Sequence, residues 1–350
     1  MTGLAFLKHV LFCAALALVS AIVVRAMIGV RLMDRPDPRK LHTTPVPKGG
    51  GVGIVAAFLL GIALLYGFAS FARIGEPYFR GVIIAATAIA LVSFLDDIFN
   101  WRFTAKLATQ ISAAALAVGS GLYVTVLHVP WLGDVDLGLW GPLATMLWLV
   151  FVTNAMNFMD GMDGLAAGTS LVASLFLAAI AASLGGWFVY FAGLLLAAGL
   201  LGFLPFNFPR ARIFMGDVGS QFCGFMLAVL GVAAARFEAV EMSFLIVPML
   251  LAGVSWDVAF TLVRRALAGE NLAHAHRGHL YQLAQRCGAD AQSVAMLHWG
   301  FAGWGGMMAI GFIAAPSPIK PFFPLALLLP QVCWTIYVLS RARHTSIGVW

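Results

Sequence analysis

The sequence predicts an all-α integral membrane protein, a polytopic bundle of about ten or eleven transmembrane helices with its long polar loops on the cytoplasmic side. The first observation is composition: of 350 residues, 61% are hydrophobic and 10% are charged, and the mean hydropathy is +0.94. A soluble domain has about 45–50% apolar and about 25% charged residues. The second observation is that apolar runs of about 20 residues, the length that crosses the hydrocarbon core, recur along the chain. Water-soluble and disordered classes are therefore excluded.

Eleven spans account for these runs, and we expect them at residues 4–27, 49–72, 81–95, 107–127, 138–157, two within 164–209, 218–235, 242–262, 294–315 and 321–340. The run 164–209 holds no acid or base and is too long for one crossing, so we divide it at Gly185-Gly186-Trp187. The first run is long and leads into Arg-rich sequence, which is not the pattern of a cleaved signal peptide. Residues 1–350 are expected to form a single transmembrane domain.

The distribution of basic residues predicts the orientation in the membrane. With eleven spans the loops alternate between two sides, and 16 of the 21 Lys and Arg then lie on one side and 5 on the other. The positive-inside rule makes the richer side cytoplasmic. We therefore expect the N-terminus outside and the C-terminus inside. The net charge of +6 is explained by a membrane surface, and nucleic acid is not expected as a partner.

Ten of the fifteen carboxylates also lie on the cytoplasmic side or at cytoplasmic span ends, and the positive-inside rule does not explain this. Carboxylates at this depth are costly and usually face a cavity or a partner. Asp96 and Asp97 are adjacent, so both ionise only if a cation is near; otherwise one keeps its proton. The pair therefore indicates a metal site or a general base. The alternative is a solvated helix end with Lys106 as the counter-charge.

Two further acidic clusters follow. Asp160 and Asp163 are three residues apart and would share one face of a helix, where Asn154 and Asn157 add amides. A helix N-terminus capped by Asp explains one carboxylate but not the whole set, so a functional role is favoured. Asp217 comes directly before an apolar run, where capping is again the alternative.

Phe214 lies three residues before Asp217, and its ring has two interpretations. It is either an aromatic anchor at the membrane interface or a flat face on which a base stacks. From the residues alone the anchor is preferred.

Basic residues occupy the two long cytoplasmic loops. Residues 39–48 form a basic stretch that could bind anionic lipid, while the glycines after Lys48 would let the backbone approach a phosphate. The later loop carries His274, His276, Arg277 and His279, which could bind a metal or donate hydrogen bonds to phosphate oxygens. No fourth zinc ligand is obvious. Asp257 is expected to neutralise Arg264 or another inward group.

Acids and bases that converge on one face indicate a metal–phosphate substrate. Mg²⁺ typically takes one or two carboxylates together with phosphate oxygens, and cationic side chains neutralise the remaining phosphate charge. We expect a protein that is buried in the bilayer and binds such a substrate at the inner interface to join a soluble phosphorylated donor to a lipid acceptor.

The motifs resemble those of the polyprenyl-phosphate N-acetylhexosamine-1-phosphate transferases, glycosyltransferase family 4. The resemblance runs from about Arg31 to Tyr281 and is specific because several motifs occur in the family's order. They are Arg39-Lys40-Leu41-His42, residues 47–51, Leu95-Asp96-Asp97, residues 154–164 and residues 213–220. It implies a multi-pass protein of the bacterial cytoplasmic (inner) membrane that transfers a HexNAc-1-phosphate from a UDP-N-acetylhexosamine to undecaprenyl phosphate and releases UMP. The oligomeric state is left open, with a homodimer as the assembly considered.

The resemblance also implies roles for individual residues. Asp217 is similar to the carboxylate that binds Mg²⁺, or Mn²⁺ as the alternative ion, with Asn157 as a second metal ligand. Asp96 and Asp97 are similar to the acidic pair near the lipid phosphate, which together with Asp217 gives the catalytic set.

The same comparison implies the substrate contacts. Asp160 and Asp163 are implied on the donor side, Asp163 in uracil recognition, and Phe214 as the ring that stacks on uracil, which replaces the anchor interpretation. The implied contacts to pyrophosphate and sugar are Lys48, Lys106, His276, Arg277 and His279.

Residues 276–282 depart from the consecutive histidines of the peptidoglycan-precursor members and resemble the O-antigen-initiating subgroup. We therefore expect GlcNAc or a deoxy-HexNAc such as FucNAc or QuiNAc as the sugar. Phospho-MurNAc-pentapeptide transfer is the alternative within the family. A secondary transporter is the alternative of a different class, although transporters place ionisable residues near the midplane and often contain inverted repeats. A non-enzymatic scaffold would not explain the ordered polar motifs.

Overall fold

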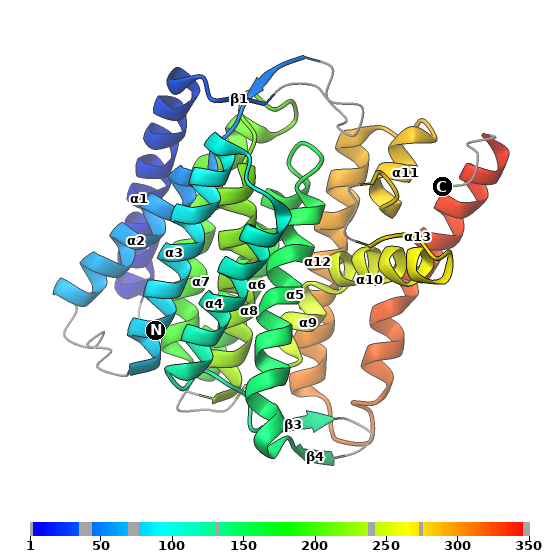
Figure 1. The fold of residues 1–350 in the computed structure, drawn as a ribbon. Helices are drawn as coiled ribbons and strands as arrows, with labels where there is room; N and C mark the ends of the chain where they lie inside the picture. Colours follow the sequence, from blue (N-terminus) through cyan, green and yellow to red (C-terminus); the bar gives the residue numbers. More distant parts are fainter. Residues whose placement is uncertain are drawn as a thin grey trace.

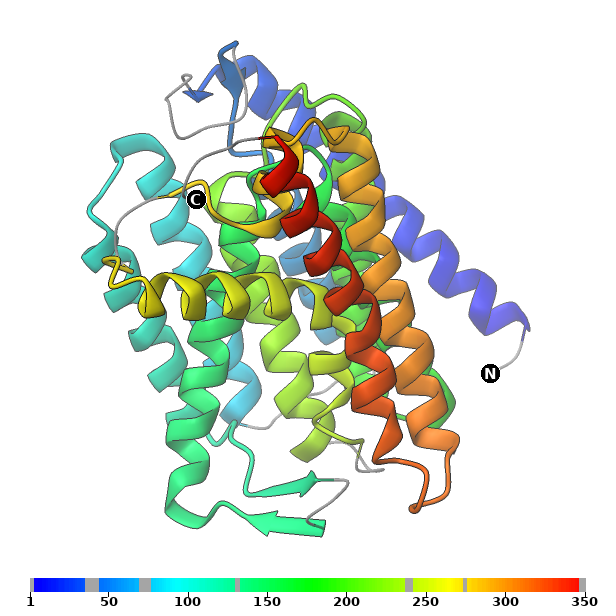
Figure 2. The same cartoon turned by 90° about the vertical axis from the view of Figure 1, so that its right-hand side faces the viewer.

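Long helices that run side by side make up nearly all of the structure, a computed structural model that describes residues 3–34, 44–68, 77–129, 133–236, 242–272 and 276–345 (Figures 1 and 2). Among the described helices, eight are long and apolar enough to cross a membrane. They are α1 (Gly3–Val30), α2 (Gly51–Phe68), α3 (Pro77–Phe99), α5 (Gly141–Met159), α6 (Leu165–Leu184), α7 (Trp187–Asn207), α8 (Gly216–Arg236) and α13 (Phe322–His344). The expected all-α polytopic membrane architecture is confirmed.

The three remaining expected spans differ from this group of eight. The span expected at 294–315 is α12 (Ala291–Ala314), which runs along the bundle beside α6 (Figure 2). The span expected at 107–127 is shorter, because α4 (Phe103–Gly119) stops before Gly121, whose φ of +105° ends the helical path. The rest of that stretch joins a hairpin strand.

The span expected at 242–262 is wrong as a single helix. The chain forms α9 (Ile246–Leu250) and α10 (Ala252–Leu267), and α10 lies across the bundle (Figure 2). Its buried face carries Asp257, Thr261 and Arg265 at successive turns, whereas Val263 and Leu267 are exposed. The buried face also contains Val254 and Val258, so it is mixed, with polar groups from Asp257 onward, and the mean hydropathy of the segment hides which face carries them.

α8 is the centre of the bundle. It is buried from Val218 to Ala234, in contact with α3 and α5, as expected for a helix that is apolar on all sides. Because its surroundings fix this helix, its first turn, which contains Asp217, has a fixed place at one end of the bundle.

Two glycines bring α2 and α8 into direct backbone contact. A Cβ added at Gly51 would lie 2.2 Å from the Cα of Gly219. The chain before α2 is tied to the chain before α8, since the amides of Gly50 and Gly51 donate to the carbonyls of Phe214 and Met215, each at 2.9 Å. The segment with the basic Lys48 is therefore held against the start of α8.

Two short antiparallel hairpins mark the two ends of the bundle (Figure 1). β1 (Met33–Asp34) pairs with β2 (Val46–Pro47), and β3 (Val126–Val129) pairs with β4 (Gly133–Asp136). The start of α1 and the end of α13 also lie toward opposite ends (Figure 2). Besides α9, the described short helices are η2 (Gly138–Trp140) and α11 (Leu280–Arg286), the latter packed against α12 and α13.

We predict that Gly51→Ala destabilises the protein, because the added methyl group would overlap the backbone of Gly219 and push α2 away from α8. Overpacking of this kind costs about 1–3 kcal/mol, which would lower the unfolding temperature of the purified protein in detergent. Gly67→Ala, on the same helix, is the matched control, since its Cβ would meet no atom within 4 Å. Equal unfolding temperatures for the two variants would contradict the packing argument.

Candidate active site

A cavity of about 330 Å³ lies at the end of the bundle that carries the β1–β2 hairpin. Its charged lining consists of five carboxylates and two lysines: Asp34, Asp96, Asp97, Asp160, Asp217, Lys48 and Lys106. The other lining residues are Asn100, Gly161, Met162, Asn207, Phe214, Gly216 and Gln282. With every group ionised the lining has a net charge of −3, so the cavity attracts cations.

Asp96 and Asp97 lie in the last turn of α3 and are almost fully buried, with 3% and 4% of each residue exposed. The amide of Trp101 donates to Asp96 at 2.7 Å. Lys48 Nζ lies 3.4 Å from an oxygen of Asp97. The two adjacent acids therefore have separate cationic partners, because the second lysine, Lys106, lies 2.5 Å from Asp96.

Asp217 receives donors on both carboxylate oxygens. Lys106 Nζ lies 2.7 Å from Oδ2, and Asn157 Nδ2 donates to Oδ1 at 3.0 Å. Asn157 also donates to the hydroxyl of Ser220 at 2.9 Å, so its amide is fixed between the two. Lys106 is thus shared by acids of two helices, and the first turn of α8 adds its positive dipole end.

Asp160 follows directly after α5 and lines the cavity. Burial raises the pKa of its carboxyl group well above the ordinary value, and the nearby Asp217 and Asp97 raise that pKa further. A cation in the cavity would oppose this effect and favour the ionised form.

Asp163 lies outside the lining of the cavity, and one of its oxygens accepts a hydrogen bond from the amide of Ala211 at 2.9 Å. It therefore supports the loop that leads to Phe214, which is among the residues that line the cavity. The proposed contacts of both residues with uracil stay predictions.

The later basic loop forms a stacked cluster beside the cavity. The rings of His276 and His279 lie 4.9 Å apart, and His279 Nδ1 lies 3.0 Å from Asp257 Oδ1. Neither histidine nor Arg277 is among the residues that line the cavity; Gln282 is the member of this segment that reaches it. Their contact with substrate stays a prediction, and His274 lies outside the described residues, as do residues 39–42.

The carboxylate of Asp257 faces another inward group, His279, rather than Arg264. It accepts hydrogen bonds from the amides of Leu280 and Tyr281, each at 3.0 Å, and so holds the N-terminus of α11. Arg264 lies 3.8 Å from Glu270 instead. Asp257 therefore anchors the loop that ends at His279.

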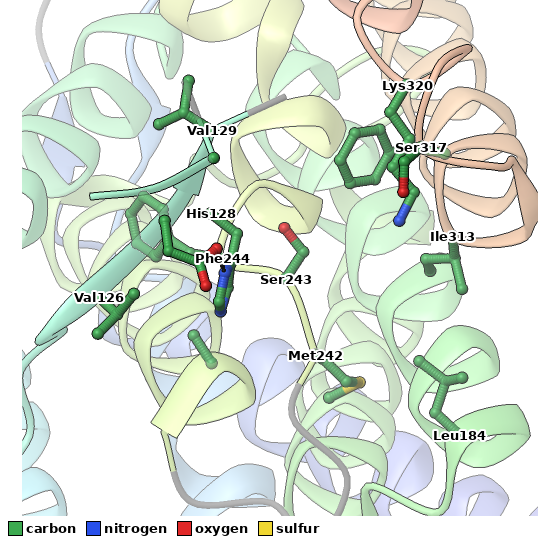
Figure 3. A pocket seen from close by; sticks show the side chains of 14 residues that line it. Val126, His128, Val129, Leu184, Met242, Ser243, Phe244, Ile313, Ser317 and Lys320 are labelled. Carbon is green, nitrogen blue, oxygen red and sulfur yellow. Dashed lines mark hydrogen bonds and ion pairs between the residues drawn. The ribbon is translucent and has the colours of Figure 1, made fainter. Parts of the chain in front are cut away.

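A larger cavity of about 460 Å³ lies at the opposite end, between the β3–β4 hairpin and the α12–α13 turn (Figure 3). His128 pairs with Asp134 across the hairpin, Lys320 lies over the ring of Phe312, and most other lining residues are apolar. With a single carboxylate in its lining, this cavity lacks the donor set that a metal–phosphate substrate requires.

Comparison with known proteins agrees with the acidic cavity. Residues 79–235, which contain Asp96 through Asp217, match the model of glycosyl transferase family 4. The chain is 31% identical over 266 residues to the probable undecaprenyl-phosphate N-acetylglucosaminyl 1-phosphate transferase of Bacillus subtilis, covering 75% of this chain and 72% of that protein. It is 33% identical over 305 residues to the decaprenyl-phosphate N-acetylglucosaminephosphotransferase of Mycobacterium tuberculosis, covering 79% and 74%. The chain belongs to the polyprenyl-phosphate N-acetylhexosamine-1-phosphate transferases.

A third relative represents another branch. The present chain is 33% identical over 206 residues to the phospho-N-acetylmuramoyl-pentapeptide-transferase of Leuconostoc mesenteroides, and the match covers 55% of this chain and 63% of that protein.

The donor groups of the cavity fit Mg²⁺ or Mn²⁺. In the described part of the chain no three His, Cys, Asp or Glu side chains are placed to hold a metal by themselves. Mg²⁺ requires fewer protein ligands than that, since it takes one or two carboxylates and completes its coordination shell with phosphate oxygens and water. The two predicted metal ligands, Asp217 and Asn157, are in contact, since the amide of Asn157 donates to Asp217, and their binding of a metal stays a prediction.

Several lining residues were not singled out from the sequence. Asp34 comes from the β1–β2 hairpin, and Asn100 and Gln282 lie near helix ends without a local pattern that marks them. Asn207 could have been noticed as a polar residue between two apolar runs. Its amide joins two loops, as it accepts from Gly164 at 2.8 Å and donates to Ile213 at 3.0 Å.

Lys106→Met should destabilise the transferase by about 1–3 kcal/mol in the absence of divalent cations, because Asp96 and Asp217 lose their shared partner. Added Mg²⁺ should restore part of the loss by replacing that positive charge. Thermal unfolding with and without Mg²⁺ tests this, with Lys320→Met at the other end of the bundle as the control. A Lys106→Met protein as stable as wild type without Mg²⁺ would argue against the shared ion pair.

His276 should be neutral at physiological pH. Burial lowers the pKa of its ring to about 4, and His279, Arg265 and Arg264 lower it as well. The folded protein then takes up this proton less readily than the unfolded chain, so it loses stability as the pH falls from about 6.5 towards 4. In His276→Gln, the unfolding temperature should fall less between pH 7 and pH 5 than in wild type. His344→Gln, at the exposed end of α13, is the control. The prediction would be contradicted if the unfolding temperature fell equally between pH 7 and pH 5 in wild type and both variants.

Proposed function

We propose that the protein transfers a HexNAc-1-phosphate from a UDP-sugar to undecaprenyl phosphate and releases UMP. The observation that carries the proposal is the cavity where five carboxylates and two lysines meet at one end of an apolar bundle. These side chains suit a diphosphate bound together with a divalent cation. Membership of the family supports a lipid phosphate as the acceptor. The names of two relatives support N-acetylglucosamine as the sugar.

The cavity is proposed to face the cytoplasm of a bacterial cell, with the protein in the cytoplasmic membrane. The excess of Lys and Arg on the side of this cavity supports that orientation. The hydrocarbon tail of the acceptor then stays in the bilayer while its phosphate reaches the cavity, and the soluble donor enters from the aqueous side.

The proposed reaction is a displacement at the β-phosphorus of the donor. An oxygen of the lipid phosphate forms a new bond to the β-phosphorus, and the bond from this phosphorus to the bridging oxygen breaks, so that UMP leaves. The second pKa of a phosphate monoester is about 6, so the acceptor is largely a dianion at pH 7. A base therefore contributes less than the placement of the charged groups in line.

The side chains of the cavity would provide that placement. Asp217, with Asn157 as the second ligand, would hold Mg²⁺, which when bound supplies positive charge to the diphosphate. Lys106 and Lys48 are paired with acids in the structure, and both can turn towards phosphate oxygens when substrate enters. Asp96 and Asp97 would then keep the two lysines and the lipid phosphate in position.

The remaining predicted contacts concern the donor. Phe214 would stack on uracil, with Asp160 and Asp163 on the same side, and His276, Arg277 and His279 would contact the sugar and pyrophosphate. The departure of residues 276–282 from consecutive histidines supports GlcNAc or a deoxy-HexNAc over the MurNAc-pentapeptide donor. A role in starting O-antigen or a related surface polysaccharide follows as part of the proposal.

A secondary transporter would place ionisable groups near the middle of the bundle. The described acids of the cavity instead gather at one end. Purified protein that takes up a solute in proteoliposomes, without release of UMP, would favour the transporter.

The decisive experiment incubates purified protein with undecaprenyl phosphate, Mg²⁺ and a panel of UDP-HexNAc donors, and measures UMP. We expect release of UMP with at least one donor, and a loss of about 100-fold or more in Asp217→Asn, as for removal of a group that stabilises transition-state charge. Asp136→Asn, on the hairpin at the other end, is the matched control.

Equal unfolding temperatures would show that Asp217→Asn still folds. Wild-type activity in this variant would refute the metal assignment, and no UMP from any donor would refute the function. A phosphosugar trapped on Asp96 or Asp97 would instead establish double displacement.

A further inference from the structure

Beneath the acidic cavity, three amide side chains from three helices join end to end. They are Gln110 of α4, Asn154 of α5 and Gln221 of α8. Gln110 and Gln221 are buried, with 3% and 2% of each residue exposed, and none of the three lines the cavity. An amide without a partner at such depth costs several kcal/mol, so these residues call for a physical explanation.

The three amides form a directed chain of hydrogen bonds that ends on Asp217. Asn154 Nδ2 donates to Gln110 Oε1 at 2.5 Å, and Gln110 Nε2 donates to Gln221 Oε1 at 2.9 Å. Gln221 Nε2 then donates to Asp217 Oδ2 at 3.3 Å. Each nitrogen donates towards the carboxylate, and the oxygens of Gln110 and Gln221 each accept from the amide before them in the chain.

The ionised carboxylate fixes this direction. A carboxylate can only accept, so Gln221 must turn its nitrogen towards Asp217 and its oxygen away. Gln110 must then donate to that oxygen, which leaves its own oxygen for Asn154. Reversal of any one amide would bring two acceptors or two donors together within a region of low dielectric. The orientation of Asn154 is therefore coupled to a carboxylate that it does not contact.

The chain lies one helical turn below the ion pair that faces the cavity. Lys106 and Gln110 are four residues apart on α4, and Asp217 and Gln221 are four apart on α8, so each pair shares a helix face. The two helices are thus joined by a Lys106–Asp217 contact at the cavity and by a Gln110–Gln221 contact below it.

The Lys106–Asp217 contact and the Gln110–Gln221 contact below it differ in how easily substrate reaches them. The side chain of Lys106 is 28% exposed and is shared with Asp96, so an incoming phosphate can compete for its ammonium group. Gln221 is buried and its two polar atoms are occupied by Gln110 and Asp217.

We propose that Gln221, oriented by Gln110 and Asn154, positions the carboxylate of Asp217 independently of Lys106. Asp217 then keeps its orientation towards the metal when Lys106 turns to a substrate phosphate. The three amides are positioning residues and touch neither substrate nor the reacting atoms. The inference rests on the proposed function for the identity of the phosphate substrate.

The test replaces glutamine by methionine, which has a similar length and lacks the amide. In Gln221→Met, we expect the Mg²⁺ concentration for half-maximal UMP release to rise about 10-fold, the usual effect of losing a group that orients a metal ligand. In Gln110→Met, the Mg²⁺ concentration for half-maximal UMP release should also rise, by a smaller factor. The double variant should be no worse than Gln221→Met alone, because Gln110 acts through Gln221.

Binding of Mn²⁺ to the purified protein without substrate, measured from the electron paramagnetic resonance signal of the free ion, gives a second readout. The dissociation constant for Mn²⁺ should rise in both variants, and it should rise more in Gln221→Met than in Gln110→Met. Gln331→Met is the matched control, since Gln331 is a buried glutamine of α13, remote from the cavity. Its metal dependence should equal that of wild type.

An unchanged metal dependence in Gln110→Met, or additive effects in the double variant, would overturn the inference. If the variants lost turnover and unfolded at a lower temperature but bound Mn²⁺ as wild type does, the amides would act through packing alone, and the inference would be wrong. It would also be wrong if the wild-type protein bound no Mn²⁺. A wild-type protein that binds Mn²⁺ but releases no UMP would refute the proposed function and leave the amide chain to be judged from Mn²⁺ binding.

Discussion

The arrangement of the acidic cavity depends on one ammonium group that two carboxylates share. Lys106 Nζ lies 2.5 Å from Asp96 and 2.7 Å from Asp217, and the three residues come from α4, α3 and α8. At this depth an isolated carboxylate is costly, whereas a paired one can remain ionised. The shared lysine therefore allows a high density of acid at one end of an apolar bundle, and it joins the three helices that carry it.

Packing below the cavity gives these charges fixed places. α8 is buried from Val218 to Ala234, and the contact of Gly51 with Gly219 brings the segment of Lys48 against its first turn. Below the cavity, the amides of α4 and α5 are linked to Asp217 through Gln221 of α8. Charges and dipoles held in advance stabilise a developing phosphoryl charge without further reorganisation. A reaction between a lipid phosphate and a nucleotide diphosphate would benefit from this rigidity, because its acceptor is already anionic and needs orientation more than activation.

Much of the fold followed from hydropathy, because lipid contact demands apolar runs of about 20 residues whatever the tertiary structure. The clearest departure is α10, where Val263 and Leu267 are exposed while Asp257 and Arg265 are buried. An average over the segment cannot separate the two faces. Asp96, Asp97, Asp160 and Asp217 were found as clusters at span ends, and the structure brings all four into one lining.

By itself the sequence determined which segments are apolar enough for a membrane and which polar motifs the family shares, since both are properties of local composition and spacing. Only the tertiary structure decided the partners. Asp163 supports Ala211, Asp257 holds the start of α11, and Gln110 meets Gln221 from 111 positions away. Such contacts depend on how helices pack against one another, and no pattern within a single helix encodes which buried donor will face which acceptor.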